Sequence, residues 1–240
     1  MRKTSGDAWR VVGGGAGALT LLGLGYVATQ WLRYGHVRKR GGPPTLLDRF
    51  LPACEVLERH ETRVAAPADV TYVAAREMRL ASSLVVRAIF RGRELLMRSS
   101  AAEARAPQSL IDEVVSIGWG VLAEEPGREI VLGAVTQPWQ CDVKFRALPF
   151  DEFAAFDEPG FAKIAWTIRA ESLGTASSLF YTETRVATTD AEARKRFRRY
   201  WTMVSPGVRL IRRESLRLVR ADAERCYRAQ LMNETPVSVS

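Results

Sequence analysis

Alternating apolar and polar positions predict an antiparallel β-sheet in the second half of the chain. In "FAKIAWTIRAES", residues 161–172, Ile164, Trp166 and Ile168 fall on one side of the predicted strand. "SSLFYTETRVATT", residues 177–189, alternates in the same way. A period of two is typical of strands with one face toward solvent. The other strands we expect are 55–65, 119–125, 128–139 and 142–148, with Pro126-Gly127 as a hairpin turn.

A helical period predicts one long C-terminal helix over residues 190–228. Asp190 is the expected N-cap, and Pro206-Gly207 is expected to kink or break the helix. Shorter helices are expected over 67–80, 82–97, 110–118 and 150–156. Apolar residues define one face of the long helix at Phe197, Trp201, Val204, Val208, Ile211 and Leu218.

A stretch of 22 residues without a charge, Val11 to Leu32, precedes all of these elements. A helix of that length is about 33 Å long, enough to cross a hydrocarbon core of about 30 Å. We interpret it as an uncleaved transmembrane anchor. A cleaved export signal and a soluble helix are the alternatives, and the residues near Ala28 make a poor cleavage site because Tyr26 occupies the −3 position.

Charges around this stretch predict a single-pass membrane protein with its C-terminal domain in the cytoplasm. The basic residues after the stretch, Arg33, Arg38, Lys39 and Arg40, are expected to lie at the lipid headgroups or to act only as a topology signal. Gly13 and Gly17 have the GxxxG spacing that can seat a second helix, which would make a homodimer.

The predicted organisation is a tail (1–10), the anchor (11–32), a basic Gly/Pro linker (33–45), a domain (46–228) and a disordered tail (229–240). The net charge of +8 belongs mostly to residues 1–44, which carry +6, whereas residues 45–240 carry +2. A nearly neutral domain disfavours nucleic acid as a partner, because such binding normally needs a strongly basic surface.

The element order resembles that of the START-like helix-grip (SRPBCC) superfamily. The resemblance is carried by "VLERHETRVAAPADVTYVAAREM", "GREIVLGAVTQPW" and "AWTIRAE…TETRVATTDAEARKRFRRYW" and covers about residues 50–228. It implies an α+β helix-grip fold, in which a curved antiparallel sheet wraps around the long C-terminal helix. It also implies an apolar cavity between sheet and helix, which holds a lipid, sterol, quinone or polyketide in many relatives.

The sequence holds none of the common motifs of enzymes that bind nucleotides, use a nucleophilic serine or bind zinc. Three widely spaced cysteines, Cys54, Cys141 and Cys226, form no metal or disulfide pattern, so we predict neither a metal nor a cofactor. His60 shares a strand face with Glu58 and Thr62, and it is either a catalytic base or a solvated strand residue.

Glu183 and Arg185 share a strand face and could orient the polar head of a ligand if that face lines the cavity. If they lie on the outer face instead, Phe180, Thr182 and Val186 face inward. The tryptophans could line the cavity or simply belong to the core. The ligand-cavity residues that we predict are Trp139, Trp166, Ile168, Tyr181, Glu183, Arg185, Trp201 and Val204.

These patterns support three functional hypotheses. The first is a membrane-anchored domain that binds a lipid or another hydrophobic small molecule in its cavity. The second is a cyclase- or dehydratase-type enzyme that uses the same cavity, with Glu183, Arg185 or His60 as its polar groups. The third is a membrane-associated scaffold without a ligand, which recruits partners through the basic residues of its last helix, or docks that helix on anionic lipid.

Overall fold

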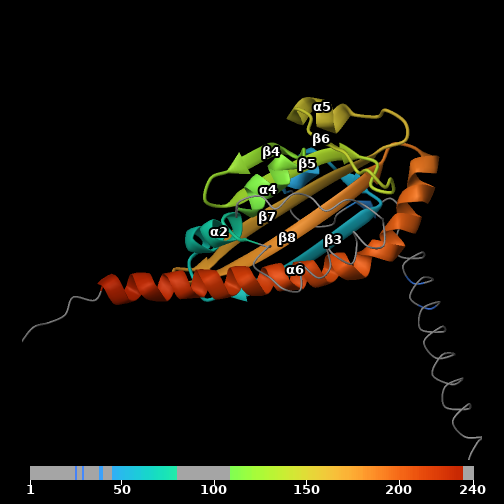
Figure 1. Cartoon of the computed structure of the whole chain (residues 1–240). Helices are drawn as coiled ribbons and strands as arrows, with labels where there is room; N and C mark the ends of the chain where they lie inside the picture. Colours follow the sequence, from blue (N-terminus) through green and yellow to red (C-terminus); the bar gives the residue numbers. More distant parts are fainter. Residues whose placement is uncertain (1–24, 26–28, 30–37, 40–44, 80–108, 235–240) are drawn as a thin grey trace, which may run out of the picture.

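A six-stranded antiparallel sheet forms the centre of the computed structural model, which describes residues 25, 29, 38–39, 45–79 and 109–234 (Figure 1). The strand order is β3-β8-β7-β5-β4, and β6 pairs with the far end of β5. A separate ladder joins β1 (Arg38–Lys39) to β2 (Ala53–Cys54). The strands of the main sheet are β3 (Val56–Val64), β4 (Gly120–Glu125), β5 (Glu129–Thr136), β6 (Phe145–Arg146), β7 (Ala162–Gly174) and β8 (Ser177–Thr188).

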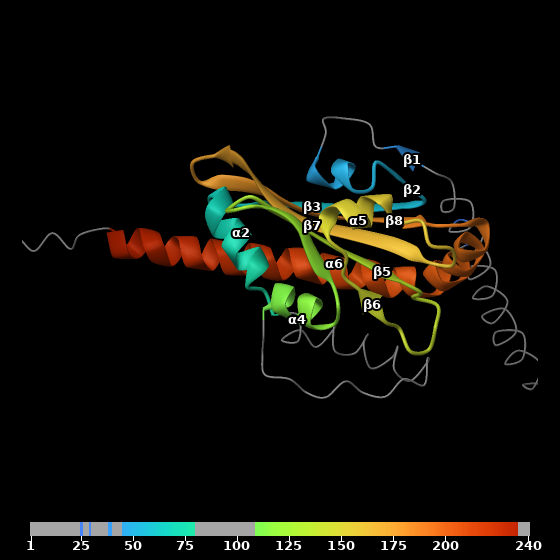
Figure 2. The ribbon, with the colours of Figure 1, turned by 90° about the horizontal axis from the view of Figure 1, so that it is seen from above.

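Helices cover both faces of this sheet (Figure 2). One face, called here the helix face, carries α2 (Ala68–Arg76), α4 (Leu110–Ser116) and α6 (Ala191–Glu234). The opposite face, called the outer face, carries the 3-10 helix η1 (Leu46–Arg49) and α5 (Phe150–Ala155). An antiparallel sheet that holds one long C-terminal helix fits the α+β helix-grip fold.

All six predicted strands of the main sheet are present, and the register confirms how their residues divide between two faces. Ile164 lies opposite Val186, and Trp166 lies opposite Thr184, so these four residues share a face. The predicted hairpin is confirmed as well. Gly127 at its turn has a φ of 75°, in the left-handed region that favours glycine.

Apolar residues seal the outer face against η1 and α5. Leu47, Phe50 and Leu51 pack with Val131, Ala165 and Phe153 in one buried cluster. Gly133 of β5 is essential to this packing, because a Cβ at this position would overlap the side chain of Leu122. Both faces of the sheet therefore bury apolar side chains. Neither is the solvent-exposed face that the alternation of apolar and polar residues suggests.

The helix face carries two separate apolar clusters. At one end Val56, Val186, Phe197 and Trp201 pack together, and the rings of Phe197 and Trp201 stack with centroids 5.7 Å apart. The cluster at the other end joins the sheet to α2, α4 and the second half of α6. Its buried members include Val64, Tyr72, Ile111, Ile130, Leu132, Ile168, Phe180, Leu216, Val219 and Ala223.

The long helix α6 begins as the sequence predicts and ends later. The Asp190 carboxylate accepts hydrogen bonds from the backbone N–H groups of Glu192 (2.7 Å) and Ala193 (2.8 Å), which confirms the N-cap. Pro206 does not break the helix, although the ribbon bends within its first half (Figure 1). Helical structure continues to Glu234, so residues 229–234 are not the disordered tail that we expected.

Several predicted segments lie outside the described residues. These are the helix 82–97, most of the linker, and the anchor 11–32 apart from Gly25 and Thr29, both helical and exposed. Among the described residues, no helix combines the length and the apolar character needed to span a bilayer. The anchor therefore stays a prediction.

A buried arginine fixes η1 to the sheet. Arg185 is 0% exposed and lies on the outer face of β8. Its guanidinium donates to Glu183 Oε1 (2.7 Å), Asp48 Oδ1 (2.6 Å) and the Leu51 carbonyl (2.7 Å). Burial alone lowers the pKa of Arg185, but the hydrogen bonds to Asp48 and Glu183 outweigh it and leave the pKa raised.

We expect Arg185→Leu to reduce the free energy of unfolding by about 3–5 kcal/mol, because it removes the nearest cation from the buried Glu183 carboxylate. Chemical denaturation of the full-length chain in detergent measures this. The control is Arg63→Leu, at an exposed position of β3. There we expect the free energy of unfolding to change by no more than about 0.5 kcal/mol. A similar small loss in both variants would show that the Arg185 contacts do not hold η1.

Candidate functional site

Polar side chains occupy the middle of the helix face, between the two apolar clusters. Glu58 and His60 of β3 lie opposite Thr184 and Thr182 of β8. Thr184 in turn lies opposite Trp166 of β7. Residues directly opposite one another in an antiparallel ladder point to the same side, so all five face α6.

Two arginines of α6 meet these residues. The guanidinium of Arg209 lies 3.3 Å from Glu58 Oε1 and pairs with that buried carboxylate. Arg212 donates from Nη2 to the Thr184 hydroxyl. We call this group the central polar cluster, and its members are Glu58, His60, Thr182, Thr184, Arg209 and Arg212.

Three buried nitrogen atoms of the cluster have no hydrogen-bond acceptor or donor among the residues that the structure describes. They are Nε and Nη1 of Arg212 and Nδ1 of His60. Buried polar atoms are normally hydrogen-bonded, because an unmade bond costs roughly 1–3 kcal/mol. Such atoms at one place indicate a site that a ligand or water completes.

The electrostatics of the cluster follow from this burial. Burial lowers the pKa of Arg212 to about 10, and the charge of Glu58 opposes that shift. Burial also lowers the pKa of His60, and the positive charge of Arg212 adds to the effect. At neutral pH the cluster therefore contains charged arginines beside a neutral imidazole.

Apolar side chains border the cluster and are not fully enclosed by the described residues. Ile164 and Trp166 point toward α6 yet remain only partly buried, as does Val208 of the helix. The indole of Trp166 donates to the Thr182 hydroxyl at 2.6 Å, which fixes the ring beside the polar groups. The site therefore combines an apolar wall with few polar groups, the usual composition of a small-molecule site.

Four of the predicted cavity residues lie in the layer between sheet and helix. Ile168 is buried in the cluster around α2, and Trp166 packs against that cluster. Trp201 and Val204 belong to the cluster at the other end. Trp139, on the loop after β5, packs against the same end and also lines a pocket of about 310 Å³ beside Asp190.

The other three predicted cavity residues, Tyr181, Glu183 and Arg185, lie on the outer face. They alternate with Thr182 and Thr184, which face the helix, so they cannot contact a ligand in that layer. Tyr181 is buried with the Arg59 guanidinium 3.9 Å from its ring centre, and burial raises its pKa to about 12. The assignment of these three residues to the cavity is corrected accordingly: they stabilise the outer face.

The predicted membrane-surface residues fall mainly outside the described part of the chain. This holds for Arg33 and Arg40, and for the predicted dimer residues Gly13 and Gly17. Arg38 and Lys39 are placed in β1, where they pair with Cys54 and Ala53. The backbone at these two linker positions is thus held against the domain.

Arg212, Arg209 and Thr184 are site residues that our sequence analysis missed, and Arg212 is the one with a recognisable signal. The buried positions of α6 are Ala193, Phe197, Trp201, Ser205, Leu216, Val219 and Ala223. Positions 205, 208, 212 and 216 follow one another at steps of three or four residues, so position 212 lies on the same side of the helix as Ser205 and Leu216. A single arginine in an otherwise apolar or small stripe is the signal that could have identified it.

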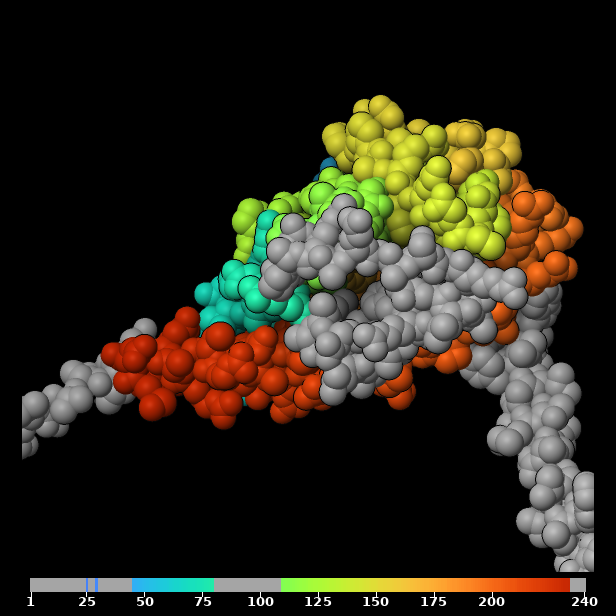
Figure 3. Space-filling model, viewed as in Figure 1, coloured from blue at the N-terminus to red at the C-terminus, as the bar shows by residue number. Residues whose placement is uncertain are grey.

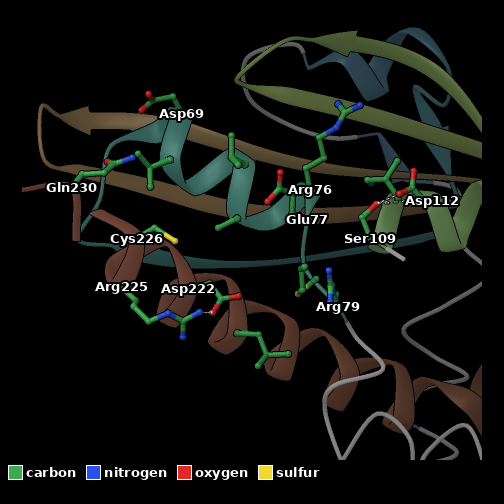
Figure 4. A pocket seen from close by; sticks show the side chains of 16 residues that line it. Asp69, Arg76, Glu77, Arg79, Ser109, Asp112, Asp222, Arg225, Cys226 and Gln230 are labelled. Atoms are coloured by element: carbon green, nitrogen blue, oxygen red, sulfur yellow. Dashed lines mark hydrogen bonds and ion pairs between the residues drawn. The ribbon is translucent and has the colours of Figure 1, made fainter. Parts of the chain in front are cut away.

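A separate pocket lies elsewhere, between α2, the start of α4 and the second half of α6 (Figure 4). Its volume is about 1200 Å³. The ten residues labelled in Figure 4 are all polar or charged except Cys226, and they come from α2, the residues just after it, the start of α4 and α6. None of the predicted cavity residues lines this pocket. Within the described residues, no group of three His, Cys, Asp or Glu side chains could hold a metal ion.

Comparisons with known proteins find no matching family model and no matching curated protein. Solved structures similar to this chain include the Zhui aromatase/cyclase from Streptomyces sp. R1128, with 16% identity over 73% of this chain and 97% of that one, at a TM-score of 0.25. Norcoclaurine synthase from Thalictrum flavum has 11% identity over 75% and 95%, at 0.33. A protein from Thermus thermophilus, TTHA0849, has 10% identity over 73% and 99%, at 0.25.

We expect acid to destabilise the protein partly through His60. Its folded-state pKa is lowered, so the unfolded chain binds the proton more readily. Stability from this residue is therefore complete above about pH 6.5 and declines as the pH falls below that value. Denaturation of His60→Gln between pH 7 and pH 5 should show a weaker decline than the wild type. His36→Gln, at the other histidine, should retain the wild-type pH dependence, and an equal decline in all three proteins would contradict this account.

Proposed function

We propose that this chain binds a hydrophobic small molecule or lipid between the helix face of its sheet and α6. The observation that carries the proposal is that buried nitrogens of Arg212 and His60, without hydrogen-bond partners among the described residues, lie beside the partly buried Ile164 and Trp166. A ligand with an apolar body and a polar group satisfies both features.

We further propose that residues 11–32 anchor the protein in a membrane, with the C-terminal domain in the cytoplasm. This part of the proposal rests on the uncharged 22-residue stretch and its basic flanks. Such an anchor would hold the binding site close to a source of apolar ligands.

An enzymatic role in the same layer is the second candidate, and His60 favours it. Its neutral imidazole has an unpartnered Nδ1 beside the buried Glu58, as a general base requires. The outer-face positions of Glu183 and Arg185 remove them from this role. A cyclisation or dehydration that survives His60→Gln unchanged would reject His60 as the base.

Native mass spectrometry with solvent extraction, on the full-length protein solubilised in detergent, tests the binding proposal. We expect a retained apolar molecule, and displacement of the neutral fluorescent probe N-phenyl-1-naphthylamine by added lipid. Ile164→Trp should weaken probe binding at least tenfold, because the larger ring fills the space beside Trp166. Val121→Trp, at an exposed position of β4, should leave it unchanged. Thermal melts of both variants verify folding. Unchanged binding in Ile164→Trp would reject this layer as the binding site, and no binding in the wild type would favour the scaffold hypothesis.

Carbonate extraction of membranes containing the full-length chain tests the anchor. We expect the wild type to remain in the pellet, and Leu21→Arg, with a charge in the middle of the stretch, to be partly released. Complete release of the wild type would reject the anchor without affecting the binding proposal.

A further inference from the structure

Arg185 and Arg212, whose guanidinium groups both include buried nitrogens, differ in their partners. On the outer face, Arg185 donates to two carboxylates and a backbone carbonyl. On the helix face, the hydrogen bond of Arg212 goes to a neutral hydroxyl, that of Thr184. Its Nε and Nη1 have no acceptor among the described residues. A buried guanidinium without an anion is unfavourable by itself, because the desolvation of its charge is not offset.

The carboxylate whose charge acts on Arg212 is that of Glu58. Glu58 forms its ion pair with Arg209, at 3.3 Å. The charged groups that act on His60 at the centre of the cluster are Glu58 and three arginines of α6: Arg209, Arg212 and Arg213. Among the described residues, the positive charges that act on His60 thus outnumber the negative one.

The free donors of Arg212 suit an anion. Nη2 carries two hydrogens, one of which is used by Thr184. The other lies parallel to an N–H of either Nε or Nη1, depending on which of the two hydrogens Thr184 uses. Such a pair of parallel N–H groups matches carboxylate or phosphate oxygens. The apolar walls, Ile164 and Trp166, lie beside it on β7.

We infer that the ligand is an amphiphile with an anionic head group, carboxylate or phosphate, which Arg212 binds while the apolar body lies along Ile164 and Trp166. This inference rests on the proposed binding function and gives it a ligand class. Arg209 keeps Glu58 paired and away from the ligand. His60 is neutral at pH 7, and it contributes a hydrogen bond rather than a charge.

Three molecules with one common oleyl chain test the inference: oleate, oleyl alcohol and 1-oleoyl-lysophosphatidate. Each competes with N-phenyl-1-naphthylamine on the full-length protein in detergent at pH 7.5. We expect oleate or the lysophosphatidate to bind at least tenfold more tightly than the alcohol, and the tighter of the two to identify the head group.

Arg212→Gln should abolish this preference and leave the affinity for oleyl alcohol unchanged. Arg213→Gln removes one charge at the neighbouring, exposed position and should retain the preference. Because Arg212 has no ion pair with a carboxylate among the described residues, the melting temperature of ligand-free Arg212→Gln should equal or exceed that of the wild type. Arg212→Lys keeps the positive charge but loses the pair of parallel N–H groups, so it should retain only part of the preference. It provides a second variant if Arg212→Gln does not fold.

Each result separates the inference from the proposed function. Equal binding of all three molecules by the wild type, or a preference that persists in Arg212→Gln, overturns the anionic head group and leaves apolar binding intact. Failure of all three molecules and of the probe to bind rejects the proposed function, and the inference with it.

Discussion

The buried charge of Arg185 is the constraint on which the arrangement of this domain depends. A guanidinium in the centre of β8 requires anions on its own face of the sheet, and Glu183 and Asp48 supply them. Asp48 belongs to η1, so neutralising the arginine also places Leu47, Phe50 and Leu51 over the sheet. The outer face is thereby closed, whereas on the helix face Ile164 and Trp166 remain only partly buried beside Arg212 and His60.

Local sequence patterns were sufficient to locate the strands, but they could not show which side of each strand faces α6. The alternation in β7 and β8 divided their residues correctly between two sides. It could not say which side meets α6, since each side of β8 carries apolar and polar residues. That choice depends on η1, more than 130 positions away from Arg185, which supplies the carboxylate and the apolar cover. Tyr181, Glu183 and Arg185 were assigned to the cavity for this reason.

The residues predicted for the cavity divide between the two faces of the sheet for a related reason. Trp166, Ile168, Trp201 and Val204 were identified because large apolar residues at regular spacing indicate a buried face. Arg212 was grouped instead with the solvated arginines of α6, because its chemical type matches theirs. Many of those do form local pairs, such as Arg217 with Glu214 and Arg225 with Asp222. The structure separates Arg212 from them by its position in the buried stripe, which depends on the tertiary packing of the whole helix.

Pro206 has a consequence for how this helix loosens. Proline has no N–H, so the ladder of backbone hydrogen bonds in α6 is interrupted at one rung between Trp201 and Arg212. The helix packs against the sheet separately on each side of this missing hydrogen bond. Phe197 and Trp201 pack before it, and Leu216, Val219 and Ala223 pack after it. Amide hydrogens on the two sides can then exchange with solvent in separate opening events, as independent cooperative units. The helix extends along the lower edge of the molecule (Figure 3). Its last turns carry the exposed Leu231 and Met232, so they open with the smallest free-energy change.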